Sequence, residues 1–268
     1  MDDAGVRARL RAGAEAPDGV LARRERDGYE IVVVKQGREL RLYFAEPRDG
    51  ALAYTGVMSR IDVTRPLKLL GAYTQAMLLT LLWAHAPHRI YAAGFGGGRL
   101  PMVLHHVFPH AEIDGAEIDG AVIALAEQYF GIVRDVRMRI AAEDAASFLQ
   151  TCRAEPAYDI ILIDCYSGAA AQPDKFATRD FYDLCKARLT TGGVVATNLD
   201  LNDPALREKT KTFAAAFAHA ACFNDGTANV LFGAEAPAPM GRVDQLARLL
   251  RGVAPIRSLA ARLKPLRA

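Results

Sequence analysis

The sequence has no apolar run long enough to cross a membrane. Its most apolar stretch, Ala76 to Ala84 (AMLLTLLWA), falls far short of the ~20 residues that a membrane-spanning helix needs, so we expect a buried helix there. The first residues, MDDAGVRARLRAGAEAPDG, are charged and contain no apolar segment, so we expect no signal peptide. These features predict a cytoplasmic protein, and a membrane surface is the less favoured alternative as a partner.

Paired cysteines and metal-ligand clusters are also lacking. The four cysteines form no CxxC motif and no cluster with histidine, which predicts free thiols in a reducing compartment and no metal site. They are Cys152, Cys165, Cys185 and Cys222. His105, His106 and His110 lie close together in the sequence, but packing or solvation explains them better than metal binding.

The chain has little net charge, and that charge is unevenly distributed. The total is +2, whereas residues 240–268 hold seven Lys or Arg and one Asp, about +6, which leaves about −4 for the rest. A mildly acidic body argues against a nucleic-acid partner and suits a cationic substrate. Leu and Ile recur at near-helical spacing in the basic tail, residues 236–268, so we expect helices that dock onto the body or a partner subunit.

The N-terminal part reads as a leader followed by β-structure. Residues 1–28 are rich in Arg, Ala and Gly, and we expect a mobile or loosely helical leader. Residues 29–66 contain three β-rich runs, YEIVVVK, RELRLYF and ALAYTGV, separated by turn residues. They predict a small antiparallel meander, followed by a helix over about 67–85.

Strand and helix patterns then alternate through the predicted catalytic domain, residues 67–235. Alternation of this kind predicts βαβ units and an α/β doubly wound sheet. The predicted strands are Arg89–Ala93, Glu112–Glu117, Val136–Ala141, Tyr158–Ile163 and Gly193–Asn198, with helices such as Ala121–Phe130 and Thr178–Leu189 between them. A helix over about 204–220 and the hairpin ACFNDGTANVLFGA follow, which places antiparallel strands at the sheet edge.

The first strand–helix junction is glycine-rich. Gly94, Gly96, Gly97 and Gly98 in IYAAGFGGGRL let the backbone turn sharply and approach a ligand closely, although a tight turn without a ligand is the alternative. A dinucleotide-binding G-x-G-x-x-G/A motif fails at its last position, so a dehydrogenase is a distant alternative.

Acidic residues end the next three strands. Glu117, followed by Ile118, can accept hydrogen bonds from ribose hydroxyls, or it is a solvated carboxylate. Asp144 can accept from an adenine amino group, cap the helix that begins at Ala145, or do both. Asp164 should face the cleft at the carboxyl ends of the strands, with a structural carboxylate as the alternative. The loop after it, CYSGAAAQPDKF, reads as a lid over the substrate.

These motifs resemble the spermidine synthase family of polyamine aminopropyltransferases in order and spacing. The similarity runs over about residues 50–235 and rests on GFGGG, GAEID, AAEDA, YDIILIDCYSG and FATRDFYDLCKARLTTGGVVATN. It implies a class I S-adenosylmethionine-dependent methyltransferase fold: a seven-stranded Rossmann-like sheet with a small N-terminal antiparallel β domain. A homodimer or homotetramer is also implied.

The resemblance assigns roles to individual residues. The glycine loop would hold the donor, Glu117 its ribose and Asp144 its adenine, while Asp164 would act on the incoming amine. The remaining implied site residues are Tyr73, which supplies a hydroxyl to the substrate, Ile118 and Ala145 beside the nucleoside, and Gln75, Cys165, Tyr166 and Ser167 at the substrate and lid.

Three positions depart from the family pattern, and each loses a negative charge. Gly97 replaces the loop acid that grips the donor's amino group, and Gln75 replaces the acid beside the tyrosine. The usual lid sequence Asp-Ser-Ser-Asp-Pro becomes DCYSG, so its second acid is also absent. These losses weaken the case for a polyamine substrate.

Three functions therefore remain open. The first is aminopropyl transfer from decarboxylated S-adenosylmethionine to a small-molecule amine. The second is methyl transfer, or another use of intact S-adenosylmethionine. The third is nucleoside binding without catalysis. For either transfer, we expect an in-line displacement at a carbon bonded to a sulfonium, with Asp164 taking the proton of the amine.

Overall fold

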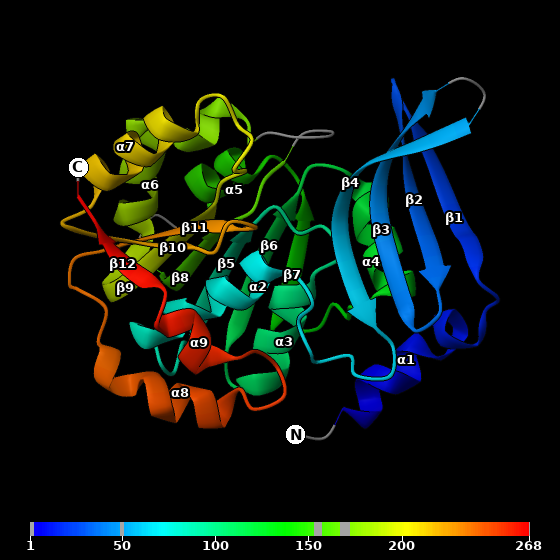
Figure 1. The fold of residues 1–268 in the computed structure, drawn as a ribbon, viewed down its shortest axis with the longest axis horizontal. Helices are drawn as coiled ribbons and strands as arrows, with labels where there is room; N and C mark the ends of the chain where they lie inside the picture. Colours follow the sequence, from blue (N-terminus) through cyan, green and yellow to red (C-terminus); the bar gives the residue numbers. More distant parts are fainter. Residues whose placement is uncertain (1–2, 49–50, 153–156, 167–171, 268) are drawn as a thin grey trace.

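Two β-sheets organise the computed structural model, which describes residues 3–48, 51–152, 157–166 and 172–267 (Figure 1). The smaller sheet has four antiparallel strands in the order β1-β2-β3-β4. They span Gly19–Arg26, Tyr29–Gln36, Glu39–Arg48 and Ala51–Asp62. Ile31 and Val33 on β2, with Leu40 and Leu42 on β3, are buried and join the main core, so one face of this sheet packs against helices that cover the larger sheet.

The N-terminal residues differ from the loose leader that we predicted over 1–28. Helix α1 (Ala4–Glu15) buries Val6 and Leu10, and β1 extends the small sheet. The last residue of β1, Arg26, forms two hydrogen bonds of 2.6 and 2.7 Å with Asp119 beyond β6. Helix α1 agrees with the helical alternative of that prediction, whereas β1 was not predicted, because its position depends on pairing with β2 and on the contact of Arg26 with Asp119.

The larger sheet has eight strands, in the order β12-β10-β11-β9-β8-β5-β6-β7. Five are parallel: β5 (Arg89–Ala93), β6 (Glu112–Glu117), β7 (Met138–Ala142), β8 (Tyr158–Ile163) and β9 (Leu189–Asn198). The other three are antiparallel: β10 (His219–Asn224), β11 (Asn229–Ala234) and β12 (Leu263–Leu266). The predicted α/β doubly wound, Rossmann-like fold is confirmed, and the sheet has one strand more than the seven expected.

The side chains of the parallel strands alternate between two cores. Ile90, Leu162 and Ala196 join the core that also contacts the small sheet, while Tyr91 and Ile163 join the core on the opposite face. In a β-strand, successive side chains point to opposite faces of the sheet, so each strand contributes to both cores.

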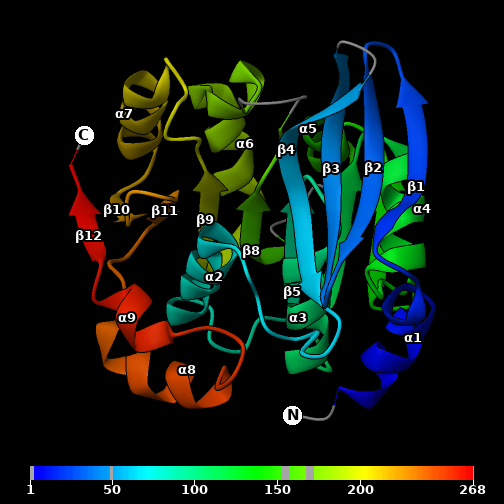
Figure 2. The ribbon, with the colours of Figure 1, turned by 45° about the vertical axis from the view of Figure 1, so that its right-hand side comes forward.

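Helices cover both faces of the larger sheet (Figures 1 and 2). One face carries α5 (Ala145–Thr151), α6 (Arg179–Arg188) and α7 (Leu206–Ala216). The other carries α2 (Ala72–Met77), α3 (Arg99–Val107), α4 (Gly120–Tyr129), α8 (Val243–Leu249) and α9 (Ile256–Ala260). Short 3₁₀ turns occur at Leu78–Leu82, Asp174–Ala177 and Met240–Arg242. None of the helices in the described ranges is long and apolar enough to cross a membrane.

The predicted helix over 67–85 is shorter than expected. It begins after Gly71 as α2 and continues as a 3₁₀ turn, in which the Thr80 hydroxyl donates to the Met77 carbonyl at 2.8 Å. Gln75 donates at 2.6 Å to the carbonyl of Leu69, which holds the preceding segment against the helix.

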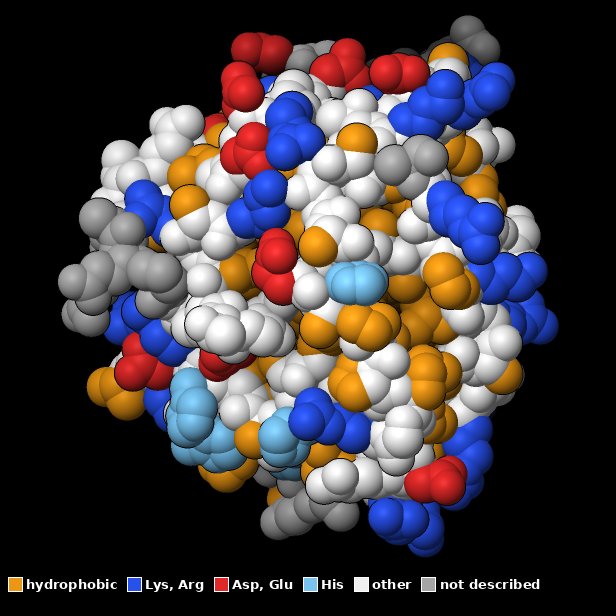
Figure 3. All heavy atoms as spheres, turned by 90° about the vertical axis from the view of Figure 1, so that its left-hand side faces the viewer, with side chains coloured by type: hydrophobic (Ala, Val, Ile, Leu, Met, Phe, Trp, Pro, Cys, Tyr) orange, Lys and Arg blue, Asp and Glu red, His pale blue; other side chains and the backbone are white. Residues whose placement is uncertain are grey.

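The basic tail packs onto the body. Leu246, Leu250 and Ile256 are buried in the core, and Arg242 donates to the carbonyls of Leu82 and Trp83, both at 3.0 Å. The tail is not wholly helical, because its last residues form β12 at the sheet edge. On the face shown in Figure 3, basic side chains are dispersed around apolar ones.

Candidate active site

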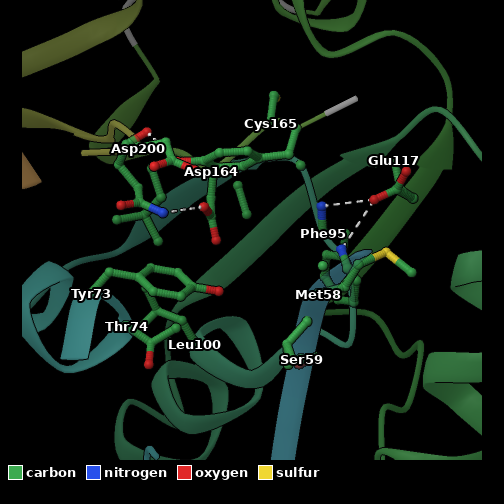
Figure 4. Close-up of a pocket in the computed structure, with 18 of the residues that line it drawn as sticks. Met58, Ser59, Tyr73, Thr74, Phe95, Leu100, Glu117, Asp164, Cys165 and Asp200 are labelled. Carbon is green, nitrogen blue, oxygen red and sulfur yellow. Dashed lines mark hydrogen bonds between the residues drawn. The ribbon is translucent and has the colours of Figure 1, made fainter. Parts of the chain in front are cut away.

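A cavity of about 1140 Å³ lies where the parallel strands end, bordered on one side by the small sheet. Ten of the predicted site residues line it: Tyr73, Gly94, Gly96, Glu117, Ile118, Asp144, Ala145, Asp164, Cys165 and Tyr166. Three predicted residues, Gly97, Gly98 and Gln75, do not. Ser167 lies outside the described residues. Figure 4 shows Glu117 on one side of the cavity and Asp164 with Tyr73 on the other.

Gly94 allows the ends of two strands to meet at the cavity. Its φ of +79° is in the left-handed region, and a Cβ there would lie 2.4 Å from the Asp164 carbonyl oxygen. A larger residue would therefore push the glycine loop away from the end of β8. Gly98 has a φ of +61° and packs against the Phe95 ring. It therefore determines the conformation of the glycine loop but does not line the cavity.

Glu117 ties the glycine loop to the end of β6. One carboxylate oxygen accepts from the backbone N–H groups of Phe95 at 3.2 Å and Gly96 at 3.0 Å (Figure 4). The other accepts from the Asp119 N–H at 3.2 Å. A carboxylate offers about four lone-pair positions, so ribose hydroxyls can share these oxygens with the loop.

Asp144 caps α5 and also forms an ion pair. One oxygen accepts from the N–H groups of Ala146 and Ser147, each at 3.1 Å, and the other accepts from the Lys175 ammonium. Burial alone would raise the pKa of Asp144, but these partners bring it below its usual value. An adenine amino group would have to share Asp144 with Lys175.

Asp164 is a cavity carboxylate that burial makes unusually basic. Removal from bulk water raises its pKa to about 6, against the opposing effect of hydrogen bonds from Asn198 and Tyr73. The Asn198 side-chain amide donates to it at 3.0 Å. A carboxyl group with this pKa is ionised at neutral pH and is a much better proton acceptor than an ordinary aspartate.

The neighbouring hydroxyl and thiol groups stay protonated. Burial, and then the charge of Asp164, raises the pKa of Tyr73 and of Tyr166, and the Tyr166 hydroxyl donates to the Asn198 carbonyl at 3.2 Å. Burial also raises the pKa of Cys165, which makes it a poor nucleophile. Asp164 is thus the basic group among these neighbours.

The cavity residues that sequence reasoning did not identify include Lys175, Asn198, Asp200 and Arg99. The rule that pointed to Asp164 could have found Asn198, because Asn198 ends the predicted fifth strand. Lys175 and Arg99 contact segments that are distant in the sequence, namely Asp144 for the first and the carbonyls of Arg60 and Pro66 for the second. Within the described ranges, no three His, Cys, Asp or Glu side chains form a group that could hold a metal ion.

Residues 85–229, just over half of the chain, match the spermine/spermidine synthase domain. The chain belongs to this family. Its relatives include both aminopropyltransferases and methyltransferases, which are all transferases. The prediction of a transferase is therefore confirmed at the level of the family.

Two curated relatives represent these two activities. The human eEF1A lysine and N-terminal methyltransferase is 32% identical over 131 residues, covering 46% of this chain and 19% of the relative. The polyamine aminopropyltransferase of Vibrio vulnificus (strain CMCP6) is 30% identical over 171 residues, covering 63% and 56%. The chain therefore matches about a fifth of the first relative's length and somewhat more than half of the second's.

Two solved structures, one of a probable spermidine synthase and one of a methyltransferase-like protein, are also similar to this chain in fold. A probable spermidine synthase from Corynebacterium glutamicum ATCC 13032 has a TM-score of 0.69 at 21% identity, covering 94% of this chain and 92% of that one, which shows the shared fold. Human methyltransferase-like protein 13, solved in complex with SAH, has a TM-score of 0.56 at 27% identity, covering 69% and 89%.

Proposed function

We propose that the chain transfers an alkyl group from an S-adenosyl sulfonium donor to an amine. The observation that carries this proposal is Asp164, a carboxylate with a pKa raised to about 6, at the wall of a cavity formed by the strand ends. In such a cavity, Glu117 and Asp144 are suited to the donor's ribose and adenine, and Ile118 offers an apolar surface beside them.

The proposed step forms a carbon–nitrogen bond and breaks a carbon–sulfur bond. The amine attacks the carbon in line with the sulfonium, and the sulfur leaves as a neutral thioether that needs no proton. An alkylammonium with a pKa of ~10.4 cannot attack, so its proton must first be removed. Asp164 accepts that proton, and the protonated Tyr73 hydroxyl beside it helps to orient the amine.

Aminopropyl transfer to a small-molecule amine is the first candidate. Membership of the spermine/spermidine synthase family and the aminopropyltransferase relatives support it. The donor would then be decarboxylated S-adenosylmethionine, and the by-product 5′-methylthioadenosine. A homodimer or homotetramer is proposed with it on the resemblance alone.

Methyl transfer is the second candidate, and one observation favours it. Gly97 stands where the family carries an acid for the donor's amino group, and a Cβ there would lie 2.5 Å from Cβ and Oγ of Ser59. The site therefore has no room for that acid. The methyltransferases among the relatives agree with this candidate, whose by-product is S-adenosylhomocysteine.

Identification of the by-product tests the proposal. The purified chain is incubated with each donor and a panel of amines, and the adenosyl products are resolved by mass spectrometry. Methylthioadenosine from the decarboxylated donor supports the first candidate, and S-adenosylhomocysteine from the intact donor supports the second. Binding of a donor analogue by calorimetry without turnover of any amine would indicate a nucleoside-binding protein instead.

A further inference from the structure

The corner of the cavity near the first turn of α3 holds a buried cation with no acidic partner among the residues that the structure describes. Arg99 lines the cavity and is only 4% exposed. Its Nε donates to the Arg60 carbonyl at 3.2 Å, and its Nη2 donates to the Pro66 carbonyl. Within the described part of the chain, no Asp or Glu forms an ion pair with it. Burial lowers the pKa of Arg99 to about 9, which still leaves it positive at neutral pH.

One arm of this guanidinium remains poorly bonded. The partner of Nη1 is the thioether sulfur of Met102 at 3.5 Å, and a thioether is a weak acceptor. A guanidinium normally places its donors on carboxylates or carbonyls. Nη1 therefore has capacity for an anionic oxygen atom.

The start of α3 adds positive potential at the same corner. The helix has nine residues, its N-cap is Gly98 with no side-chain cap, and its first turn contains no acid. Unpaired N–H groups and the helix dipole at such an end favour an anion. Arg99 and the helix end are separate features with the same sign.

The acid that would neutralise this corner is absent for a steric reason. Ser59 of β4 is 8% exposed, and its side chain occupies the space that a Cβ at Gly97 would need. In Figure 4, Ser59 and Leu100 lie across the cavity from Asp200 and Cys165. Asp164 and Asp200 thus lie on one wall, and Arg99, which is bonded to the Arg60 carbonyl next to Ser59, lies near the opposite one. The other charged lining residues are Glu117, Asp119, Asp144 and Lys175.

We propose that this corner binds the carboxylate of the donor's amino-acid tail, and that Arg99 makes the chain select the carboxylated donor, intact S-adenosylmethionine. The inference rests on the proposed function, which places the nucleoside at Glu117 and the sulfur toward Asp164. The tail then extends toward Ser59 and Leu100. A decarboxylated tail would carry only its ammonium into a corner that is already positive.

Three adenosyl thioethers with different tails test this proposal without turnover. S-Adenosylhomocysteine has the full tail, decarboxylated S-adenosylhomocysteine lacks only the carboxylate, and methylthioadenosine lacks both charged groups. We expect the first to bind at least about tenfold more tightly than the other two, as a charge-assisted contact would give. Calorimetry on the full chain measures all three dissociation constants.

Substitution of Arg99 locates the selectivity. In Arg99→Met, S-adenosylhomocysteine should bind no more tightly than methylthioadenosine, whose own affinity should stay within about threefold of the wild type. Arg99→Lys should retain part of the preference because it keeps the charge. The inference would be overturned if Arg99→Met weakened the binding of all three ligands equally, or if the wild type bound S-adenosylhomocysteine no more tightly than the other two. A wild-type chain that binds no adenosyl thioether would instead overturn the proposed function.

A second variant leaves Arg99 untouched, because Arg99 also anchors the carbonyls of Arg60 and Pro66. Ser59→Gly removes the two atoms that a Cβ at Gly97 would meet most closely, and Gly97→Asp in the same chain then adds an acid beside the positive corner. We expect the ratio of its affinities to shift by about tenfold toward the decarboxylated thioether, while its affinity for methylthioadenosine stays unchanged. Ser59→Gly alone is the control. An unchanged preference for the carboxylated ligand would also contradict the proposal.

Discussion

The side-chain amide of Asn198 donates a hydrogen bond of 3.0 Å to the carboxylate of Asp164. Asn198 is the last residue of β9, Asp164 directly follows the adjacent parallel strand β8, and both line the cavity. Burial raises the pKa of Asp164, while this amide and the Tyr73 hydroxyl oppose the rise. The balance leaves a carboxylate that is ionised at neutral pH yet basic enough to receive a proton.

Asp164→Asn should abolish most of the turnover while sparing donor binding. The amide has nearly the same shape but cannot take the proton of the amine, so we expect kcat to fall by about 10²-fold or more. Donor affinity, measured by calorimetry, should change by less than about threefold. Asp180→Asn, at an exposed position of α6, is the control and should retain wild-type kcat. Equal kcat in the wild type and Asp164→Asn would remove Asp164 from the mechanism.

The pH dependence of kcat/KM should reflect the ionisation of Asp164. Its pKa is raised to about 6, so the basic form is lost as the pH falls through about 6, rather than near 4 as for an ordinary aspartate. We expect kcat/KM to rise through that pH and then level off until the amine loses its own proton.

Asn198→Ala should move that midpoint to higher pH. The hydrogen bond from Asn198 favours the ionised carboxylate, so its removal should raise the pKa of Asp164 further. Asn202→Ala, also at the cavity, is the control and should leave the midpoint at about 6. A profile with the same midpoint in Asn198→Ala would show that another group controls it.

Much of the fold was predictable because its strands are apolar and bounded by turns. Runs such as YDIILID are buried on both faces, so they read as central strands of a parallel sheet. By contrast, β1 (GVLARRER) has few apolar side chains, and its place depends on pairing with β2 and on the Arg26–Asp119 ion pair. Strand β12 contains Pro265, which local sequence rules exclude from most strands, yet it pairs with β10 at the sheet edge.

In the site, too, some residues could be predicted from the local sequence, and others are positioned by contacts with distant parts of the chain. Glu117, Asp144 and Asp164 could be placed together because the carboxyl ends of parallel strands meet at one edge of the sheet. The pairing of Lys175 with Asp144 joins a 3₁₀ turn to a helix cap, and no spacing rule connects them. The prediction for Gln75 was made from a motif alone, and its side chain binds the Leu69 carbonyl instead of lining the cavity.

Glu117→Gln should weaken donor binding and loosen the glycine loop. The carboxylate accepts three backbone N–H groups, and a glutamine amide would turn an NH₂ donor toward some of them. We expect S-adenosylhomocysteine affinity to fall by about 10-fold to 100-fold, the range for loss of charge-assisted hydrogen bonds. Glu112→Gln, at the opposite end of β6, is the control and should bind as the wild type does. Undiminished affinity in Glu117→Gln would place the ribose elsewhere.

Lys209→Met should destabilise the chain strongly, because Lys209 joins two loops beside the cavity. Its ammonium lies 2.8 Å from Asp203 and 2.6 Å from the Gln172 carbonyl, and its side chain and that of Asp203 are 6% and 5% exposed. Removal of one partner leaves a buried charge without compensation, which costs about 3–5 kcal/mol. Urea unfolding should show this loss for Lys209→Met and almost none for Lys211→Met, an exposed position on the same helix. If the two variants unfold at the same urea concentration, the buried ion pair does not hold these loops together.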